Sequence, residues 1–175
     1  MTTPKLIMFD LFGTVVSLAR VPHSEIKAYA DHIHQAEWSP LVLPRSWDLL
    51  PAHEGAREAI TLLRKKAAVV TCSNAPLATQ VHLAWINDLH FDGIMPLELW
   101  QVYKPNPRAY MSVIACLGID LSEAMMVTAN ETFGDLEAAK ALGIQPCLIC
   151  DNPEVPRDGV LCVRSIQELY DHLSK

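Results

Sequence analysis

Short apolar runs alternate with segments of helical spacing along the whole chain. The runs at 5–10, 67–73, 124–129, 147–150 and 160–163 are continuously apolar, which is typical of strands buried on both faces of a sheet. The segments with helical length and spacing are 55–66, 76–84, 107–117, 134–142 and 165–173. This order predicts an α/β fold built on a doubly wound, mostly parallel sheet.

One segment, Ser17 to Ala52, interrupts the alternation, because it separates the first strand from the helix that leads to the second. Its first half has the spacing of a helix that Ser24 would cap. The apolar stripe of this helix consists of Ile26, Tyr29, Ile33 and Ala36. We expect residues 17–52 to form a small cap over the strand ends, and residues 1–16 and 53–175 to form the α/β core. The alternative is that the insert only covers an edge of the sheet.

Charge and hydropathy narrow the choice of partners. The 175 residues carry a formal net charge of -6, and the basic residues are scattered. Nucleic acid and anionic membranes are therefore not expected as partners, because phosphate binding needs clustered positive charge. No apolar run approaches the roughly 18 residues of a membrane span, and the first residues lack the long apolar run of a signal peptide. We expect a cytoplasmic protein that acts on a small-molecule substrate.

Polar residues collect where apolar runs end. Asp10 follows the first run, and Ser73 and Asn74 end the second. Lys104 follows the run LELWQVY, and the segment 130–135 follows the run AMMVTA. Each of these residues alone also suits a turn or a helix cap. Because ligands of doubly wound sheets bind outside the carboxyl ends of the strands, their arrival at successive strand ends favours an active site.

Four short signatures stand in order along the chain: DLFGT at 10–14, SN at 73–74, YKPNPRAY at 103–110 and NETFGDLEAAKALG at 130–143. Together they resemble the signatures of the haloacid dehalogenase superfamily. The resemblance implies a Rossmann-like core with a central strand order close to 5-4-1-2-3, an aspartate nucleophile and a mobile cap. Phe12, two residues after Asp10, and Tyr110, six residues after Lys104, resemble the 2-haloacid dehalogenase branch.

Phe12 bears on the chemistry that Asp10 can perform. In the phosphatase branch this position is an acid that protonates an alkoxide leaving group, and Phe12 has no proton to give. Halide is so weak a base that it leaves without a proton. An apolar Phe12 would instead exclude water and shape a pocket for a small organic acid. The residue therefore favours attack on carbon over attack on phosphorus.

Asn130 bears on the metal. It stands where Mg²⁺-dependent members of the superfamily carry a metal-ligand carboxylate, and Mg²⁺ prefers anionic oxygen in a tight octahedral geometry. A phosphate dianion approaching Asp10 would need that metal, whereas a monoanionic haloacid could be bound by Lys104 and neutral donors. We therefore expect no cofactor and no metal, with Mg²⁺ required only if the protein is a phosphatase.

The resemblance implies covalent catalysis in two steps. The Asp10 carboxylate displaces halide from C2 and forms an ester, which water then hydrolyses to release a 2-hydroxy acid. Lys104 would keep Asp10 ionised and oriented, and its alternative is a surface salt bridge. Asp135 would hold Lys104 or the hydrolytic water, and its alternative is a helix N-terminal cap.

Further residues complete the predicted site. Thr14, Ser73 and Asn74 would hydrogen-bond the nucleophile, the substrate carboxylate or the departing halide, and Phe12 and Asn130 would also contact substrate. Tyr110 would frame the pocket, with a place in the hydrophobic core as its alternative.

The predicted cap is shorter than the helical cap of the dehalogenases that the chain resembles. In that family a cap arginine binds substrate, and Arg20 and Arg45 are the two arginines of the insert. Trp38 and Trp47 flank Arg45 and would form either an apolar wall or ordinary packing. Because a short cap leaves the site more open, two alternatives stay open: a larger substrate, or a homodimer whose partner covers the site.

Three functions follow from these patterns. The first is a metal-independent 2-haloacid dehalogenase acting on small 2-halo carboxylates. The second is a Mg²⁺-dependent phosphatase, suggested by the superfamily as a whole and by Asp135. The third is a binding or regulatory protein on the hydrolase scaffold, suggested by the short cap and by Asn130.

Overall fold

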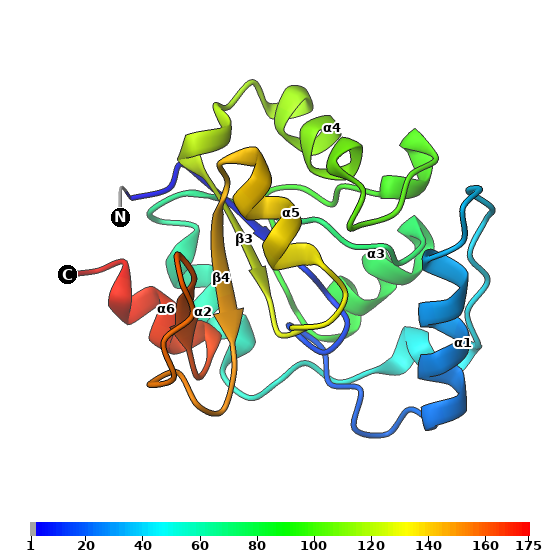
Figure 1. The fold of residues 1–175 in the computed structure, drawn as a ribbon. Coiled ribbons are helices and arrows are strands. Elements are labelled where there is room, and N and C mark those ends of the chain that lie inside the picture. Colours follow the sequence, from blue (N-terminus) through cyan, green and yellow to red (C-terminus); the bar gives the residue numbers. More distant parts are fainter. Residues whose placement is uncertain (1–2) are drawn as a thin grey trace.

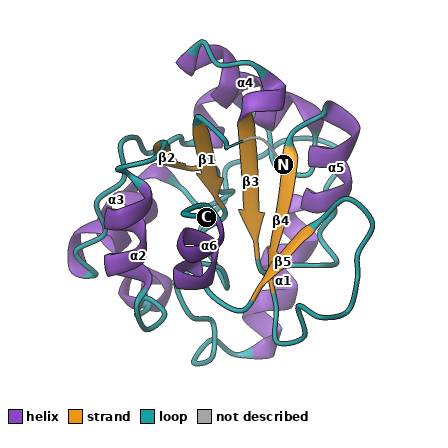
Figure 2. Cartoon of the chain, turned by 90° about the vertical axis from the view of Figure 1, so that its left-hand side faces the viewer, coloured by secondary structure: helices purple, strands orange, loops and turns teal. Residues whose placement is uncertain are grey.

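The computed structural model describes residues 3–175, and its centre is a parallel five-stranded sheet between layers of helices (Figure 2). The strands are β1 (Leu6–Phe9), β2 (Ala68–Thr71), β3 (Ala124–Thr128), β4 (Gln145–Ile149) and β5 (Leu161–Val163). Each overlaps one of the predicted apolar runs. The predicted α/β class, with a doubly wound parallel sheet, is confirmed.

The strands lie side by side in the order β2-β1-β3-β4-β5. The expected order places a further strand beside β2, between β2 and β3 in the sequence. Gly93 and Pro96 lie at that place, but they form only isolated parallel bridges, to Val70 and Ser73. Proline has no N–H to donate to a ladder, so this edge does not develop into a full strand. With the segment counted as the third strand, the arrangement agrees with the expected order, and β5 is an addition at the opposite edge.

Helices cover both faces of the sheet. One face carries α2 (Ala56–Leu63), α3 (Leu77–Ile86) and α6 (Ile166–His172), and the other carries α4 (Pro107–Leu117) and α5 (Asp135–Leu142) (Figure 2). Single turns of 3-10 helix, η2 (Leu97–Trp100) and η3 (Leu121–Glu123), lie in the connections before α4 and β3. Within the described part of the chain, no helix has the length and apolar character needed to cross a membrane.

The central strand β1 explains why the strands are continuously apolar in sequence. Ile7 and Phe9 pack in the core beneath α2, α3 and α6, whereas Leu6 and Met8 pack in the core beneath α4 and α5. All four side chains are completely buried. Burying one such side chain stabilises the fold by about 1.5–3 kcal/mol. The strand that ends at Asp10 is therefore firmly held from both faces.

Local signals set the bounds of α4. The Asn106 side chain accepts a hydrogen bond from the Arg108 backbone N–H at 3.0 Å, and Pro107 follows the cap directly. Gly118 ends the helix with φ 64°, a left-handed conformation that costs glycine little. The chain after Lys104 therefore passes at once into the helix that carries Tyr110.

Residues 17–52 contain α1 (His23–Ile33) and the 3-10 helix η1 (Arg45–Leu49). An antiparallel bridge between Val16 and Ala52 joins the two ends of this segment. In Figure 1, α1 stands apart from both helical layers, beyond the carboxyl ends of the strands. The segment therefore leaves and re-enters the α/β core at one point.

Two details of α1 differ from the prediction. Ser24 does not cap the helix, because Pro22 occupies the N-cap position and no side chain bonds the free N–H groups there. Proline has the backbone angle of a helix start built in, which lets α1 begin two residues earlier than a Ser24 cap would allow. The helix ends at Ile33, so Ala36 lies beyond it, while Tyr29 and Ile33 are buried as the apolar stripe predicts.

Candidate active site

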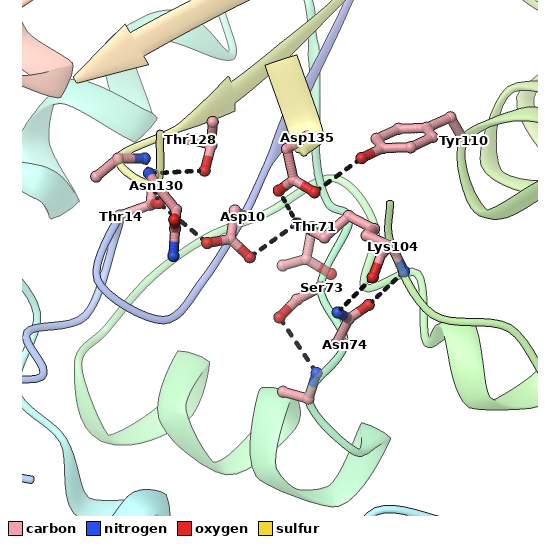
Figure 3. Close-up of polar contacts among 12 residues, drawn as sticks. Asp10, Thr14, Thr71, Ser73, Asn74, Lys104, Tyr110, Thr128, Asn130 and Asp135 are labelled. Carbon is pink, nitrogen blue, oxygen red and sulfur yellow. Dashed lines mark hydrogen bonds and ion pairs between the residues drawn. The ribbon is translucent and has the colours of Figure 1, made fainter. Parts of the chain in front are cut away.

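Asp10 lies directly after β1, at the carboxyl edge of the sheet. Its backbone N–H donates to the Val127 carbonyl at 2.9 Å, which ties it to β3. Its carboxylate accepts two side-chain hydrogen bonds, from Thr14 Oγ1 to Oδ2 at 3.1 Å and from Lys104 Nζ to Oδ1 at 2.9 Å (Figure 3). Only 7% of the residue is exposed. The carboxylate is therefore desolvated and held in one orientation.

Lys104 joins two carboxylates. Its Nζ lies 2.9 Å from Asp10 Oδ1 and 2.7 Å from Asp135 Oδ2. The lysine side chain is only 3% exposed, so the alternative of a surface salt bridge is wrong. A single buried ammonium therefore neutralises part of the charge of two acids that come from β1 and α5.

Asp135 is the first residue of α5. Gly134 holds the N-cap position, and no side chain caps that helix, so Asp135 does not serve as the cap. Its Oδ1 instead accepts a hydrogen bond from the Tyr110 hydroxyl at 2.8 Å. Tyr110 is completely buried, and its ring belongs to the core beneath α4. The tyrosine therefore lies behind Asp135, away from the cavity that Asp10 faces (Figure 3).

Asn74 and Ser73 follow β2 and differ in their contacts. The Asn74 side chain accepts from the Lys104 backbone N–H at 2.8 Å and donates to the Lys104 carbonyl at 3.2 Å. The Ser73 hydroxyl accepts from the Ala75 backbone N–H at 3.3 Å and does not line the cavity at Asp10. Asn74 thus holds the segment that carries Lys104, whereas Ser73 shapes the turn after β2.

Thr14 and Asn130 connect the ends of β1 and β3. Thr14 Oγ1 donates to Asp10 and accepts from the Ala129 backbone N–H at 2.8 Å. Asn130 Oδ1 accepts from the backbone N–H and the hydroxyl of Thr132, at 3.0 and 3.1 Å. Asn130 lines the cavity, but its side-chain oxygen is engaged within its own turn.

A small cavity of about 40 Å³ adjoins these groups. Its polar wall consists of Asp10, Asn74, Lys104, Asn130 and Asp135. Its apolar wall consists of Phe12, Leu18, Ile26, Tyr29 and Phe133. Since a cavity needs at least about 10–15 Å³ to hold one water, this cavity has room for about three waters at most. A substrate would have to displace half-buried side chains of the apolar wall.

The sequence model of haloacid dehalogenase-like hydrolases matches residues 25–143, well over half of the 175 residues. The chain belongs to the haloacid dehalogenase-like hydrolases. This membership confirms the resemblance found in the four signatures and identifies the chain as a hydrolase. No curated protein sequence matches the chain significantly.

Solved structures resemble this haloacid dehalogenase-like hydrolase over nearly its whole length. The defluorinating L-2-haloacid dehalogenase Rha0230 has 20% identity and a TM-score of 0.79, covering 98% of this chain and 96% of its own. The L-2-haloacid dehalogenase of Xanthobacter autotrophicus with chloropropionic acid covalently bound has 14% identity and a TM-score of 0.78, covering 98% and 99%. The HAD-hydrolase YfnB of Bacillus subtilis bound to magnesium has 15% identity and a TM-score of 0.73, covering 99% and 100%. At identities of 20% or less, these similarities show a shared fold and nothing finer.

Phe12 faces the cavity of this hydrolase as part of an aromatic cluster. Its ring meets Tyr29 edge-on at 5.7 Å and Trp47 edge-on at 4.9 Å, and only 5% of the residue is exposed. Trp47 is completely buried behind Phe12, and its Nε1 donates to Glu25 at 2.8 Å. Trp47 is therefore packing that supports the wall, and Trp38 packs beside Tyr103, outside the cavity.

The predicted cap arginines do not reach the site. Arg20 and Arg45 are both exposed, and neither lines the cavity. Sequence reasoning missed Tyr29 as a site residue, although it placed Tyr29 on the buried stripe of α1. It also missed Ile26, which lies on the same stripe. Leu18 and Phe133 were missed too, and their one signal was apolar character near a predicted strand end or within a signature.

Two buried carboxylates face one ammonium in this hydrolase. Burial raises the pKa of Asp10, and the negative charge of Asp135 raises it further, while Lys104 and the Thr14 hydrogen bond act in the opposite direction. Burial alone would lower the pKa of Lys104, but Asp10 and Asp135 outweigh it and hold that pKa above its usual value. The two carboxylates therefore favour the ammonium form of Lys104.

Mg²⁺ is the cofactor that the phosphatase members imply, and the donors here fit it poorly. Asp10 and Asp135 both bind the Lys104 ammonium, and Asn130 contributes an amide oxygen that already accepts from Thr132. Among residues 3–175, no three histidine, cysteine, aspartate or glutamate side chains are grouped so that they could hold a metal ion. Mg²⁺ prefers anionic oxygen ligands, so this donor set does not match it.

Proposed function

We propose that this hydrolase displaces halide from C2 of small 2-halo carboxylates through an ester on Asp10. The observation that carries the proposal is the aromatic wall opposite the nucleophile, where Phe12 packs edge-on against Tyr29 at 5.7 Å. A phosphatase of this family would need an acid two residues after the nucleophile to protonate the leaving group, and Phe12 has no proton to give. Halide needs no proton on leaving, so an apolar wall is compatible with its departure.

The first step is a displacement at carbon. Asp10 supplies the electron pair that forms the new carbon–oxygen bond, and the carbon–halogen bond breaks with its electrons leaving on the halide. Thr14 and Lys104 hold the carboxylate at 3.1 and 2.9 Å and so orient it for attack. This orientation removes rotational freedom before the reaction, which lowers the barrier.

The second step is hydrolysis of the ester. Water attacks the Asp10 carboxyl carbon, and the bond from that carbon to the ester oxygen on C2 breaks. A 2-hydroxy acid leaves with that oxygen, and the water oxygen stays on Asp10. One water proton ends on the product hydroxyl, and the other is released when Asp10 becomes a carboxylate again. In this proposal Asp135, which lines the cavity, accepts the proton from the attacking water.

Residues 17–52 act as the cap in this proposal. They contribute Leu18, Ile26 and Tyr29 to the cavity at Asp10. A cavity of about 40 Å³ does not hold a haloacid, so substrate entry must move this wall. Lid movement of this kind commonly sets the rate of enzymes with enclosed sites.

A Mg²⁺-dependent phosphatase is the second candidate. It is favoured by the likeness in fold to YfnB, whose structure was determined bound to magnesium, and by the two carboxylates at the carboxyl edge of the sheet. Its test is Mg²⁺-dependent hydrolysis of an aryl phosphate ester.

The deciding experiment measures halide release from 2-chloropropionate, with and without EDTA. The proposal expects release by the wild type that survives EDTA and disappears in Asp10→Asn. Asp171→Asn, an exposed aspartate on α6, is the matched control and should retain full activity. Absence of release from every short 2-haloacid, or unchanged release in Asp10→Asn, would overturn the proposal.

A further inference from the structure

The proposed substrate brings a carboxylate into a site that is already negative. Asp10 and Asp135 share the single Lys104 ammonium, and no arginine lines the cavity. Arg20 and Arg45 are exposed on the outside of the insert. The substrate carboxylate therefore needs a hydrogen-bond donor other than an arginine.

Tyr29 brings such a donor to the cavity from α1. The residue lines the cavity and is 7% exposed. Its ring is held by Phe12 at 5.7 Å and by Trp47 at 5.5 Å, so the hydroxyl has little freedom to turn away. It is the one residue of the insert with a side-chain hydrogen-bond donor in this cavity. The Tyr29 hydroxyl is therefore the polar group that residues 17–52 contribute to the site.

The surroundings of the Tyr29 hydroxyl leave its proton available. The Asn74 side chain lies close enough to the Tyr29 hydroxyl to oppose part of the rise in its pKa. Asn74 is itself fixed to the Lys104 backbone by two hydrogen bonds. Within residues 3–175, no hydrogen bond has the Tyr29 hydroxyl as its donor. Burial and the nearby Asp10 raise the pKa of Tyr29, so the phenol stays protonated and neutral.

We propose that Tyr29 binds the substrate by donating a hydrogen bond to its carboxylate. The inference rests on the proposed function and deepens it. It assigns the binding of the substrate carboxylate to a neutral hydroxyl of the cap instead of a cap arginine. Asn74, which lies close to the Tyr29 hydroxyl, is hydrogen-bonded to the Lys104 backbone. The hydroxyl therefore reaches the polar side of the cavity, near Asp10. The substrate carboxylate is bonded to C2 and lies to the side of the line along which Asp10 attacks, whereas the halide leaves along that line. The apolar side chains of Leu18, Ile26 and Phe133 are then left for the halide and the carbon chain.

The test compares Tyr29→Phe with the wild type. The variant keeps the ring that packs on Phe12 and removes only the hydroxyl. Tyr103→Phe is the matched control, because the Tyr103 hydroxyl donates to the Ser39 carbonyl at 2.7 Å and lies outside the cavity. We expect Tyr29→Phe to raise KM for 2-chloropropionate about tenfold, the size of one hydrogen bond to a charged group. The kcat should change far less, whereas a purely structural role through Asn74 and Lys104 would lower kcat.

A binding measurement separates this inference from the proposed function. Propionate carries the carboxylate without a halogen, so it binds without reacting. Its dissociation constant should rise about tenfold in Tyr29→Phe and stay unchanged in Tyr103→Phe. If the wild type releases no halide but Tyr29→Phe still weakens propionate binding, the proposed function fails and the role of Tyr29 stands. Equal KM and equal propionate binding in Tyr29→Phe and wild type, or no propionate binding by the wild type, would overturn the role of Tyr29.

Discussion

The side chain of Asn74 binds both polar groups of the Lys104 backbone, across thirty residues of the chain. The Lys104 N–H donates to Asn74 Oδ1 at 2.8 Å, and Asn74 Nδ2 donates to the Lys104 carbonyl at 3.2 Å. This pair of hydrogen bonds fixes the point at which Lys104 leaves the backbone. It therefore also fixes where the Lys104 ammonium meets Asp10.

Replacing Asn74 tests this relationship. We expect Asn74→Ala to lower the free energy of unfolding by about 1–3 kcal/mol, because the Lys104 N–H and carbonyl remain buried without a partner. We also expect kcat for halide release to fall, because the ammonium is less well placed. Urea denaturation and a halide assay measure the two effects, with the exposed Asn152→Ala as control. Unchanged stability together with unchanged kcat would show that Lys104 is positioned by other contacts.

Replacing Lys104 tests the balance of charge at the site. In Lys104→Met the carboxylates of Asp10 and Asp135 lose their shared ammonium, and we expect destabilisation of about 3–5 kcal/mol at neutral pH. Without the ammonium that lowers it, the pKa of Asp10 in the folded state rises further, so the folded protein binds more protons than the unfolded chain, and stability falls as pH rises. Denaturation at acid and neutral pH should show the larger loss at neutral pH, and halide release should be abolished. A loss of stability that is equal at both pH values would contradict this account.

The pH dependence of the wild type follows from Asp10. Burial and Asp135 raise the pKa of Asp10. In the proposed mechanism only the ionised carboxylate attacks, so we expect activity to fall as pH drops through that pKa. The acid limb of kcat/KM should therefore lie above about 3.9, the ordinary value for aspartate. Asp135→Asn removes a neighbouring negative charge, so we expect the limb to move to lower pH while the plateau rate also falls. A limb that moved to higher pH would contradict the assignment.

Tyr110 provides a test of a residue that acts through another. Its hydroxyl donates to Asp135 Oδ1 at 2.8 Å but does not reach the cavity. We expect Tyr110→Phe to lower kcat about fivefold, equivalent to about 1 kcal/mol for one hydrogen bond, and to leave KM unchanged. Tyr170→Phe, on α6, changes a tyrosine far from the site and should alter neither constant. An increase in KM for Tyr110→Phe would place the tyrosine against the substrate.

Most of the α/β core could be predicted from the sequence, because its signals are local. A strand buried on both faces must be apolar at every position, as Leu6 to Phe9 are, and a helix must repeat its apolar residues about every turn. Asn106, Pro107 and Gly118 mark the ends of α4 by their own backbone and capping preferences. The predicted start of α1 is wrong because Ser24 and Pro22 are both compatible with the N-cap position, and local preference does not decide between them.

The site could be predicted in part, for a different reason. Asp10, Asn74 and Asp135 follow β1, β2 and β3, and Lys104 follows the 3-10 helix η2, so the parallel sheet brings all four together at one edge. The sequence does not show which atoms of these side chains form hydrogen bonds with one another. That Tyr110 stands behind Asp135 and not in the cavity depends on how α4 packs against α5.

The sequence by itself determined the order of strands and helices, the edge of the sheet at which the signature residues meet, and the hydrolase family to which they belong. Only the tertiary structure decided that Arg20 and Arg45 face outward and that Tyr29 faces Asp10's cavity. The physical reason is that periodicity and capping act between residues close in the chain. The direction of a side chain in an irregular insert depends on contacts with residues far from it in sequence, such as those of Tyr29 with Phe12 and Trp47.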